Sequence, residues 1–187
     1  MTKFNIRWFS DASLSQPIIW AVTTLSLALA FFATPTRAQT PSSPNNDHVS
    51  QTVTQLADPC RAVLITDDTP QFYVSQIDIQ ASCKTFTVVL QHKGRLPKSA
   101  TGHNWALVLA EHVNGVTRDG SKASTSNNFI KPGDERVIAH IPIVGRGEAA
   151  EVSFATDLLK VNEPYTFLST VDGQSAIMRG TLVRLGS

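Results

Sequence analysis

The sequence carries little charge and no excess of either sign. Charged side chains make up 17% of the 187 residues, and 16 basic residues stand against 15 acidic ones. A nucleic-acid-binding surface needs a stripe of Lys and Arg, and no such stripe is present. The sequence also has no internal repeat and no long low-complexity tract. These absences leave one globular domain of ordinary size, preceded by a leader.

The main apolar run of the sequence is too short for a membrane-spanning helix. Ile18–Ala33 falls below the roughly 20 residues that such a helix needs. Lys3 and Arg7 precede the run, and Thr36-Arg37-Ala38 places small residues where a signal peptidase reads them. We therefore predict a secretory signal peptide over residues 1–38, export to the periplasm and no stable membrane span after cleavage. An uncleaved membrane anchor is the alternative, and the absence of cysteine at the cleavage site argues against a lipoprotein.

The segment after the leader has few apolar residues. Residues 39–57 are rich in Pro, Ser, Asn and Thr, which predicts a flexible linker. The leader holds three of the 16 basic residues and one of the 15 acidic ones, so its removal leaves 13 and 14 and a net charge near −1. The mature chain therefore has no basic signature for nucleic acid.

The rest of the chain has the pattern of an all-β domain. Short apolar or alternating runs are separated by Gly, Pro, Asn and Asp, which favours a β-sandwich. The predicted strands are Ala62–Ile65, Cys83–His92, Trp105–Leu109, Arg136–Ile141, Ala150–Ala155, Tyr165–Thr170 and Gly180–Val183. The interval Glu111–Phe129 is too long for a hairpin loop and has room for a short helix. Trp105, a large aromatic in an apolar strand, is expected to fill the core.

Two stretches contain the candidate functional residues. The loop after Tyr165–Thr170 spaces Ser169, Gln174 and Met178 five and four residues apart, so a tight turn would bring the three side chains together. The run Gly102-His103-Asn104-Trp105 is the expected counterpart. With Cys60, Cys83 and the runs LPKSATGHNW, KPGDERVIAH and SAIMRGTL, these stretches resemble the azurin family of blue-copper cupredoxins.

The resemblance covers residues 58–187 without gaps. It implies a Greek-key β-sandwich of the azurin-like cupredoxin type with a short helical insertion. It also implies a disulfide between Cys60 and Cys83, an even pair suited to an oxidising compartment. Such a bridge is typically worth about 2–4 kcal/mol. The alternative, that one of the two cysteines is a ligand or nucleophile, stays open at this stage.

The resemblance implies copper as the cofactor and also names its ligands. Gly102, His103 and Met178 match the family's ligand positions, whereas Ser169 stands at its cysteine and Gln174 at its second histidine. The loop reads S-x4-Q-x3-M in place of C-x4-H-x3-M. A blue-copper site needs a thiolate and two imidazoles with a weak axial thioether, and a neutral hydroxyl and an amide are poor substitutes. Asp172 is a possible extra ligand.

We therefore predict a periplasmic azurin-like cupredoxin with a degenerate type 1 copper site, which has lost electron transfer and acts as a binding or scaffold module. Ser169, Gln174 and His103 could form a metal-free polar network. The alternative is a copper-binding protein that keeps the family's electron-transfer or copper-carrier role through the modified site.

An enzyme is not expected. Ser169, His103 and Asp172 could be interpreted as a hydrolytic triad, but no Gly-x-Ser-x-Gly surrounds the serine. The expected partner is a periplasmic redox protein or another protein, and we expect a monomer. The resemblance places an apolar docking ring around the site, where this chain has Leu96, Ala100 and Val171 but also Thr101, Ser121 and Asp172.

Overall fold

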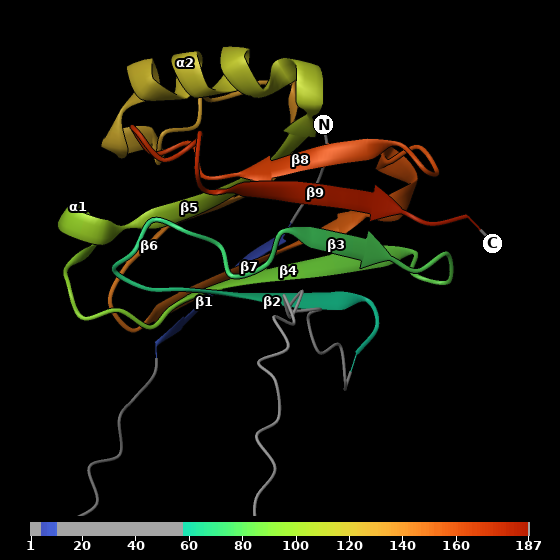
Figure 1. The fold of residues 1–187 in the computed structure, drawn as a ribbon, viewed down its shortest axis with the longest axis horizontal. Coiled ribbons are helices and arrows are strands. Elements are labelled where there is room, and N and C mark those ends of the chain that lie inside the picture. Colours follow the sequence, from blue (N-terminus) through green and yellow to red (C-terminus); the bar gives the residue numbers. More distant parts are fainter. Residues whose placement is uncertain (1–4, 11–57, 187) are drawn as a thin grey trace, which may run out of the picture. The chain divides into compact units, whose positions relative to one another are not determined.

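The computed structural model describes residues 5–10 and 58–186, which form two sheets packed face to face (Figure 1). The first sheet has the order β1 (Asn5–Ser10), β7 (Glu148–Ala155), β4 (Thr85–His92) and β2 (Arg61–Thr66). The second has the order β3 (Gln76–Ile79), β9 (Arg179–Arg184), β8 (Pro164–Leu168), β5 (His103–Leu109) and β6 (Val137–Val144). The predicted β-sandwich is confirmed.

The chain passes from one sheet to the other between β2 and β3 and again between β3 and β4. β2 pairs with β4 in parallel, and β3, which lies between them in sequence, pairs in parallel with β9 of the other sheet. The remaining pairings are antiparallel. All seven strands predicted from the sequence are present, although β8 ends at Leu168, two residues earlier than expected. The sequence analysis did not predict β1 or the four-residue β3.

The core between the sheets consists of alternate strand residues. Phe86, Val88 and Leu90 of β4 are fully buried, as their alternation predicted. Trp105 is also fully buried, and its ring stacks on that of Phe167 with 6.3 Å between centroids. Trp105 is therefore a core residue of the sandwich.

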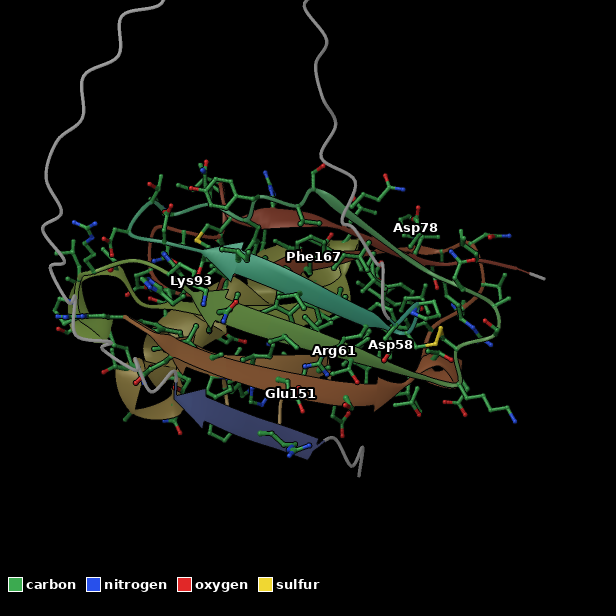
Figure 2. The ribbon with its side chains drawn as sticks, turned by 90° about the horizontal axis from the view of Figure 1, so that it is seen from below. Asp58, Arg61, Asp78, Lys93, Glu151 and Phe167 are labelled. Carbon is green, nitrogen blue, oxygen red and sulfur yellow. A yellow bond between two sulfur atoms is a disulfide. The ribbon has the colours of Figure 1, made fainter. Side chains whose placement is uncertain are left out.

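The outer face of the first sheet carries an ion pair between a buried glutamate and a partly exposed arginine. Glu151 of β7 is only 6% exposed, and its Oε2 lies 2.8 Å from a terminal guanidinium nitrogen of Arg61 on β2. Figure 2 shows the two side chains on the same face of the sheet, with Phe167 behind it. The pair spans β4, which lies between the two strands.

The predicted disulfide joins Cys60, just before β2, to Cys83, just before β4. The S–S distance is 2.04 Å and the Cα atoms are 5.5 Å apart. These are the only two cysteines in the sequence. The chain therefore has no free thiol to offer a metal or a substrate.

The interval between β5 and β6 forms the predicted helical insertion. It contains the 3₁₀ turn η1 (Ala110–His112), the helix α2 (Val113–Ala123) and the 3₁₀ turn η2 (Thr125–Asn127). Val116 of α2 packs with Ala106, Val108 and Leu168 in a second buried cluster. Gly120 is required because a Cβ there would lie 2.2 Å from Phe129 O, where the chain returns beneath the helix.

An ion-pair cluster ties the insertion to the strand that follows it. Arg136, just before β6, donates to both carboxylate oxygens of Asp134 at 2.7 and 2.6 Å and to Asp119 of α2 at 2.7 Å. These hydrogen bonds lower the pKa of both carboxyl groups. Paired bonds from one guanidinium fix geometry as well as charge, so α2 is anchored at its middle.

Of the predicted leader and linker, only Asn5–Ser10 falls within the described residues, as strand β1. The apolar run, the cleavage site and the linker 39–57 lie outside them, so the signal peptide and the linker stay predictions. Among the described residues, no helix is both long and apolar enough to cross a membrane.

Candidate functional site

The two stretches singled out in the sequence meet at one end of the second sheet. Gly102 follows the one-turn helix α1 (Lys98–Thr101) and leads into β5, which begins at His103. The loop between β8 and β9 closes where Ser169 N donates to Met178 O at 2.9 Å. Inside the loop, Met178 N bonds back to Gln174 O at 2.8 Å. This folding brings the Gln174 side chain back over the start of β5.

The side-chain amide of Gln174 occupies the centre of the site. Its Oε1 lies 2.7 Å from Ser169 Oγ and 3.0 Å from His103 Nδ1. Its Nε2 donates to Gly102 O at 3.2 Å. Four of the predicted site residues are thus in direct contact, and Met178 is fully buried in the same loop.

Each ring nitrogen of His103 faces an oxygen that only accepts. Gln174 Oε1 lies 3.0 Å from Nδ1 and Asp67 O lies 2.8 Å from Nε2, so a neutral ring, which carries one N–H, donates to one of the two. If the Gln174 amide turned over, its Nε2 would donate to Nδ1, but its Oε1 would then face Gly102 O. In both arrangements Gln174 engages Nδ1, and His103 is only 1% exposed.

A second amide, Asn104, extends the network into the insertion. Asn104 is fully buried, and its Nδ2 donates to Asn128 O and to Thr170 Oγ1, both at 2.7 Å. Its Oδ1 accepts from Thr170 N at 2.8 Å and lies 3.1 Å from Ser169 Oγ. Thr170 Oγ1 in turn donates to Phe129 O at 2.8 Å. The site loop, the start of β5 and the return from α2 therefore share one buried network.

The sequence analysis did not assign a role to Asn104. Its only signal was its place beside His103 in the run GHNW, where an amide directly precedes the apolar residues of a strand. A buried amide needs several partners, and these partners lie 24 to 66 residues away in sequence. Periodicity alone does not reveal contacts of that range.

His92 supports His103 from behind. The two rings stack with 5.3 Å between centroids and an interplanar angle of 21°. His92 Nε2 lies 2.9 Å from Thr101 O, and Nδ1 accepts from Gly94 N at 3.1 Å. His92 is therefore a hydrogen-bonded structural histidine, and it limits how far the ring of His103 can move.

Asp68 orders the loop on the other side of the site. Its carboxylate accepts from Arg95 N at 2.9 Å, from Leu96 N at 3.0 Å and from Thr101 Oγ1 at 3.0 Å. The two backbone hydrogen bonds are the largest cause of the lowered pKa of this carboxyl group. Asp68 therefore holds the loop before α1 in a fixed position relative to the turn after β2.

The rim of the site mixes apolar and polar side chains. Leu96 is 46% exposed and Ile177 is 60% exposed, which makes them the prominent apolar groups on this rim. Ala100, Ser121 and Asp172 are also exposed. The predicted extra ligand Asp172 thus lies on the surface of the turn, whereas His103, Ser169 and Met178 are buried.

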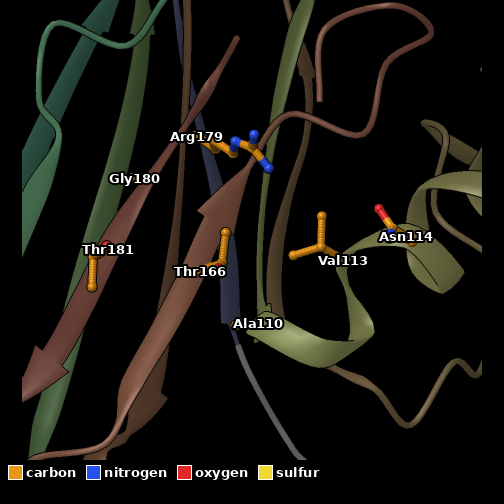
Figure 3. Close-up of a pocket in the computed structure, with 7 residues that line it drawn as sticks. All are labelled: Ala110, Val113, Asn114, Thr166, Arg179, Gly180 and Thr181. Carbon is orange, nitrogen blue, oxygen red and sulfur yellow. The ribbon is translucent and has the colours of Figure 1, made fainter. Parts of the chain in front are cut away.

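A hollow of about 420 Å³ lies away from this site (Figure 3). It opens between the start of α2 and the outer face of β8 and β9. Its lining residues are Ala110, Val113, Asn114, Thr166, Arg179, Gly180 and Thr181. None of the predicted ligand residues is among them.

Comparison with known proteins identifies the fold and the family. The family described as "Copper binding proteins, plastocyanin/azurin family" matches residues 61–184. Azurin iso-2 of Methylomonas sp. strain J is 42% identical over 123 residues, which cover 66% of this chain and 95% of that protein. Azurin of Pseudomonas denitrificans is 44% identical over 123 residues, which cover 66% of this chain and 96% of that azurin.

A solved structure gives the same result. The structure of the azurin Az-iso2 from the obligate methylotroph Methylomonas sp. strain J matches with a TM-score of 0.66 and 40% sequence identity. The match covers 68% of this chain and 98% of that one. The similarity therefore spans nearly all of the azurin, and it accounts for about two thirds of this chain.

Proposed function

Because this chain belongs to the plastocyanin/azurin family of copper-binding proteins, we propose that it is a periplasmic azurin-like protein that has lost blue-copper electron transfer. In this proposal Gly102, His103 and Met178 occupy the family's ligand positions, and Ser169 and Gln174 replace its cysteine and second histidine. The domain then serves as a binding or scaffold module for another protein.

The position of the Gln174 amide is the observation that carries this proposal. Its two polar atoms bond to Gly102 O, His103 Nδ1 and Ser169 Oγ, groups that would otherwise face a metal ion. A blue-copper centre needs a thiolate and two imidazoles. Both cysteines are joined in the disulfide, so no thiolate is available. The residues present do not fit a type 1 copper ion.

The network also has a structural benefit without metal. Buried polar atoms are stable when each has a partner, and Ser169, Gln174, His103 and Asn104 supply partners to one another. An unsatisfied buried polar group costs about 1–3 kcal/mol. The network therefore stabilises the loop between β8 and β9 through protein groups alone.

The site gives little support to a hydrolytic enzyme. Ser169 is fully buried, and its hydroxyl lies within hydrogen-bond distance of Gln174 and Asn104. Asp172 is exposed in the turn, whereas both ring nitrogens of His103 face Gln174 and Asp67. A triad requires a nucleophile that a substrate can reach and a histidine that contacts it.

A second candidate function is copper binding through a modified site, as a copper carrier or colourless centre. It is favoured because Gly102 O and His103 Nδ1 both contact the Gln174 side chain. If that side chain rotated outward, the two groups would face a space that could hold a metal ion. Gln174 is partly exposed, so it has space to move. Met178, Ser169 or Asp172 could then complete the coordination.

Metal analysis and calorimetry test the two candidates. Protein purified from the periplasm is expected to hold substoichiometric copper and, after loading, to lack the intense blue absorption of the family. Titration with copper(II) and copper(I) is expected to give the same small heats for the wild type and for His103→Ala. Copper binding by the wild type that is lost in His103→Ala would instead support the copper carrier. A blue, redox-active wild-type protein would contradict both candidate functions.

A further inference from the structure

The hollow between α2 and the outer face of β8 and β9 has the size of a small-ligand site. Its volume of about 420 Å³ lies near the lower end of the range of roughly 300–1,000 Å³ that is typical of ligand pockets. Val116 packs α2 against the second sheet, and the Arg136–Asp119 ion pair ties the middle of the helix to the start of β6. The walls of the hollow are therefore fixed by the fold.

Two threonines form the floor of the hollow. Thr166 of β8 and Thr181 of β9 lie directly opposite each other in the antiparallel ladder. Their neighbours Tyr165, Phe167 and Leu182 belong to the core, so both threonines project from the outer face of the sheet. Directly opposite residues have Cβ atoms about 4.5–5.5 Å apart. The two hydroxyl groups are therefore close neighbours, and each can donate and accept a hydrogen bond.

Of the described residues that line the hollow, only Arg179 is charged. Its side chain is exposed, and the guanidinium group points from β9 toward the side on which α2 lies (Figure 3). No described residue forms an ion pair or a side-chain hydrogen bond with it. Glu111, the acidic residue beside Ala110, lies instead 3.8 Å from His112 Nε2. The positive charge of Arg179 is therefore available to an anion.

The other lining residues add neutral polar groups and apolar surface. Within the described part of the chain, the side chains of Asn114, Thr166 and Thr181 have no hydrogen-bond partner. Val113 and Ala110 present hydrocarbon surface at the start of the insertion. The hollow thus combines one positive charge, three neutral hydrogen-bonding side chains and an apolar wall, which is the usual composition of a small-molecule site.

We propose that this hollow binds a small organic monocarboxylate. The guanidinium group of Arg179 presents a planar fork of donors that matches the two oxygens of a carboxylate. The threonine hydroxyls lie beside this fork, and Val113 contacts the hydrocarbon part of the ligand. A monoanion fits because the lining supplies a single positive charge. Neither Gln174 nor the copper-ligand positions take part, so this site goes beyond the proposed function and is tested separately from it.

Nuclear magnetic resonance titration with benzoate tests the site in the wild-type protein. Backbone amides of residues 110–114 and 179–181 should shift and saturate. Benzamide has the same shape without the charge, so it should bind about tenfold more weakly or worse. Inorganic phosphate should also bind more weakly than benzoate. Benzamide or phosphate binding as tightly as benzoate, or no saturable shift with benzoate, would overturn the proposal.

Variants of the lining identify the groups that bind benzoate. Arg179→Gln should weaken binding by about tenfold or more. Arg146→Gln, the matched control, removes an exposed arginine from the turn between β6 and β7 and should leave the affinity unchanged. Thr166→Val/Thr181→Val keeps the branched shape of both side chains, removes their hydroxyls and should weaken binding several-fold. Wild-type affinity in Arg179→Gln or in the double threonine variant would overturn the proposal.

Discussion

The side chain of Asn104 and the backbone and hydroxyl of Thr170 form a reciprocal pair: Nδ2 donates to Oγ1 at 2.7 Å, and Oδ1 accepts from Thr170 N at 2.8 Å. The two residues are 66 positions apart in the sequence. This pair joins the start of β5 to the end of β8 directly through protein groups. The loop is therefore held at its base without any contribution from a metal.

Replacing Asn104 should destabilise the domain. Asn104→Ala leaves Thr170 N and Asn128 O without their partner, and each buried unsatisfied group costs about 1–3 kcal/mol. Urea denaturation should show a fall of that order in the free energy of unfolding. Asn114→Ala, an exposed amide on α2, is the matched control and should change it little. Equal effects in the two variants would mean that the Asn104 network adds no stability.

Removing the Gln174 amide should also destabilise the protein. Gln174→Ala removes a partner from His103 Nδ1, Ser169 Oγ and Gly102 O at once. We expect a loss of about 1–3 kcal/mol of unfolding free energy, reduced if water enters the space. Thermal denaturation with and without copper measures it. An unchanged melting temperature in the absence of copper would show that the network is not stabilising.

Introducing the family's two missing copper ligands should produce a blue copper site. Ser169→Cys/Gln174→His supplies the thiolate and the second imidazole that a type 1 centre requires. Copper(II) should then give intense blue absorption and a reversible one-electron wave. Thr166→Cys/Gln174→His, with its thiol on the outer face of β8, is the control and should stay colourless. A colourless double variant at Ser169 and Gln174 would show that the surrounding residues, and not those two alone, prevent the blue centre.

Acid should weaken the anchor of α2. The carboxyl groups of Asp134 and Asp119 have a pKa below their usual 3.8 because Arg136 bonds to them. A lowered pKa in the folded state adds stability that is present above the unfolded value and is lost as the pH falls through the lower folded value. The free energy of unfolding should therefore decline below about pH 3.8, and the decline should be shallower in Asp134→Asn. Parallel profiles for the two proteins would contradict this.

Loss of the disulfide should have a larger effect than loss of any single hydrogen bond. Cys60→Ser/Cys83→Ser opens a link between residues 23 positions apart, and the expected loss is about 2–4 kcal/mol. Guanidinium denaturation of the variant beside the oxidised wild type measures the difference. Identical midpoints would show that strand pairing alone fixes the start of β2.

The sequence was sufficient to predict most of the sandwich because its strands alternate around large apolar residues. Phe86, Val88 and Leu90 mark one such strand. The strand β3 was missed because Gln76–Ile79 is short and includes a charged Asp78. β1 was missed because a basic, partly apolar N-terminus is also typical of a signal peptide. β1 pairs with β7, which is far away in the sequence, so the local sequence around residues 5–10 does not indicate this pairing.

The candidate site could be predicted as a set of residues, but its internal arrangement could not. The spacing of Ser169, Gln174 and Met178 indicated their convergence. It could not indicate that the Gln174 amide points at His103 Nδ1, because that orientation depends on Gly102 O and on the turn that returns Gln174 over β5. Asn104 was overlooked because its partners come from two distant segments, at Asn128 and at Ser169–Thr170.

The hydrogen bond from Ser169 N to Met178 O has a practical consequence for protein engineering. It joins the two ends of the β8–β9 loop next to the last paired residues of these strands. The residues between Ser169 and Met178 therefore form a loop whose two ends are held in fixed positions. Closing a somewhat longer loop costs little extra entropy. Loops of other lengths and ligand sets can therefore be grafted between these two anchors, which makes the domain a natural host for transplanted metal-binding loops.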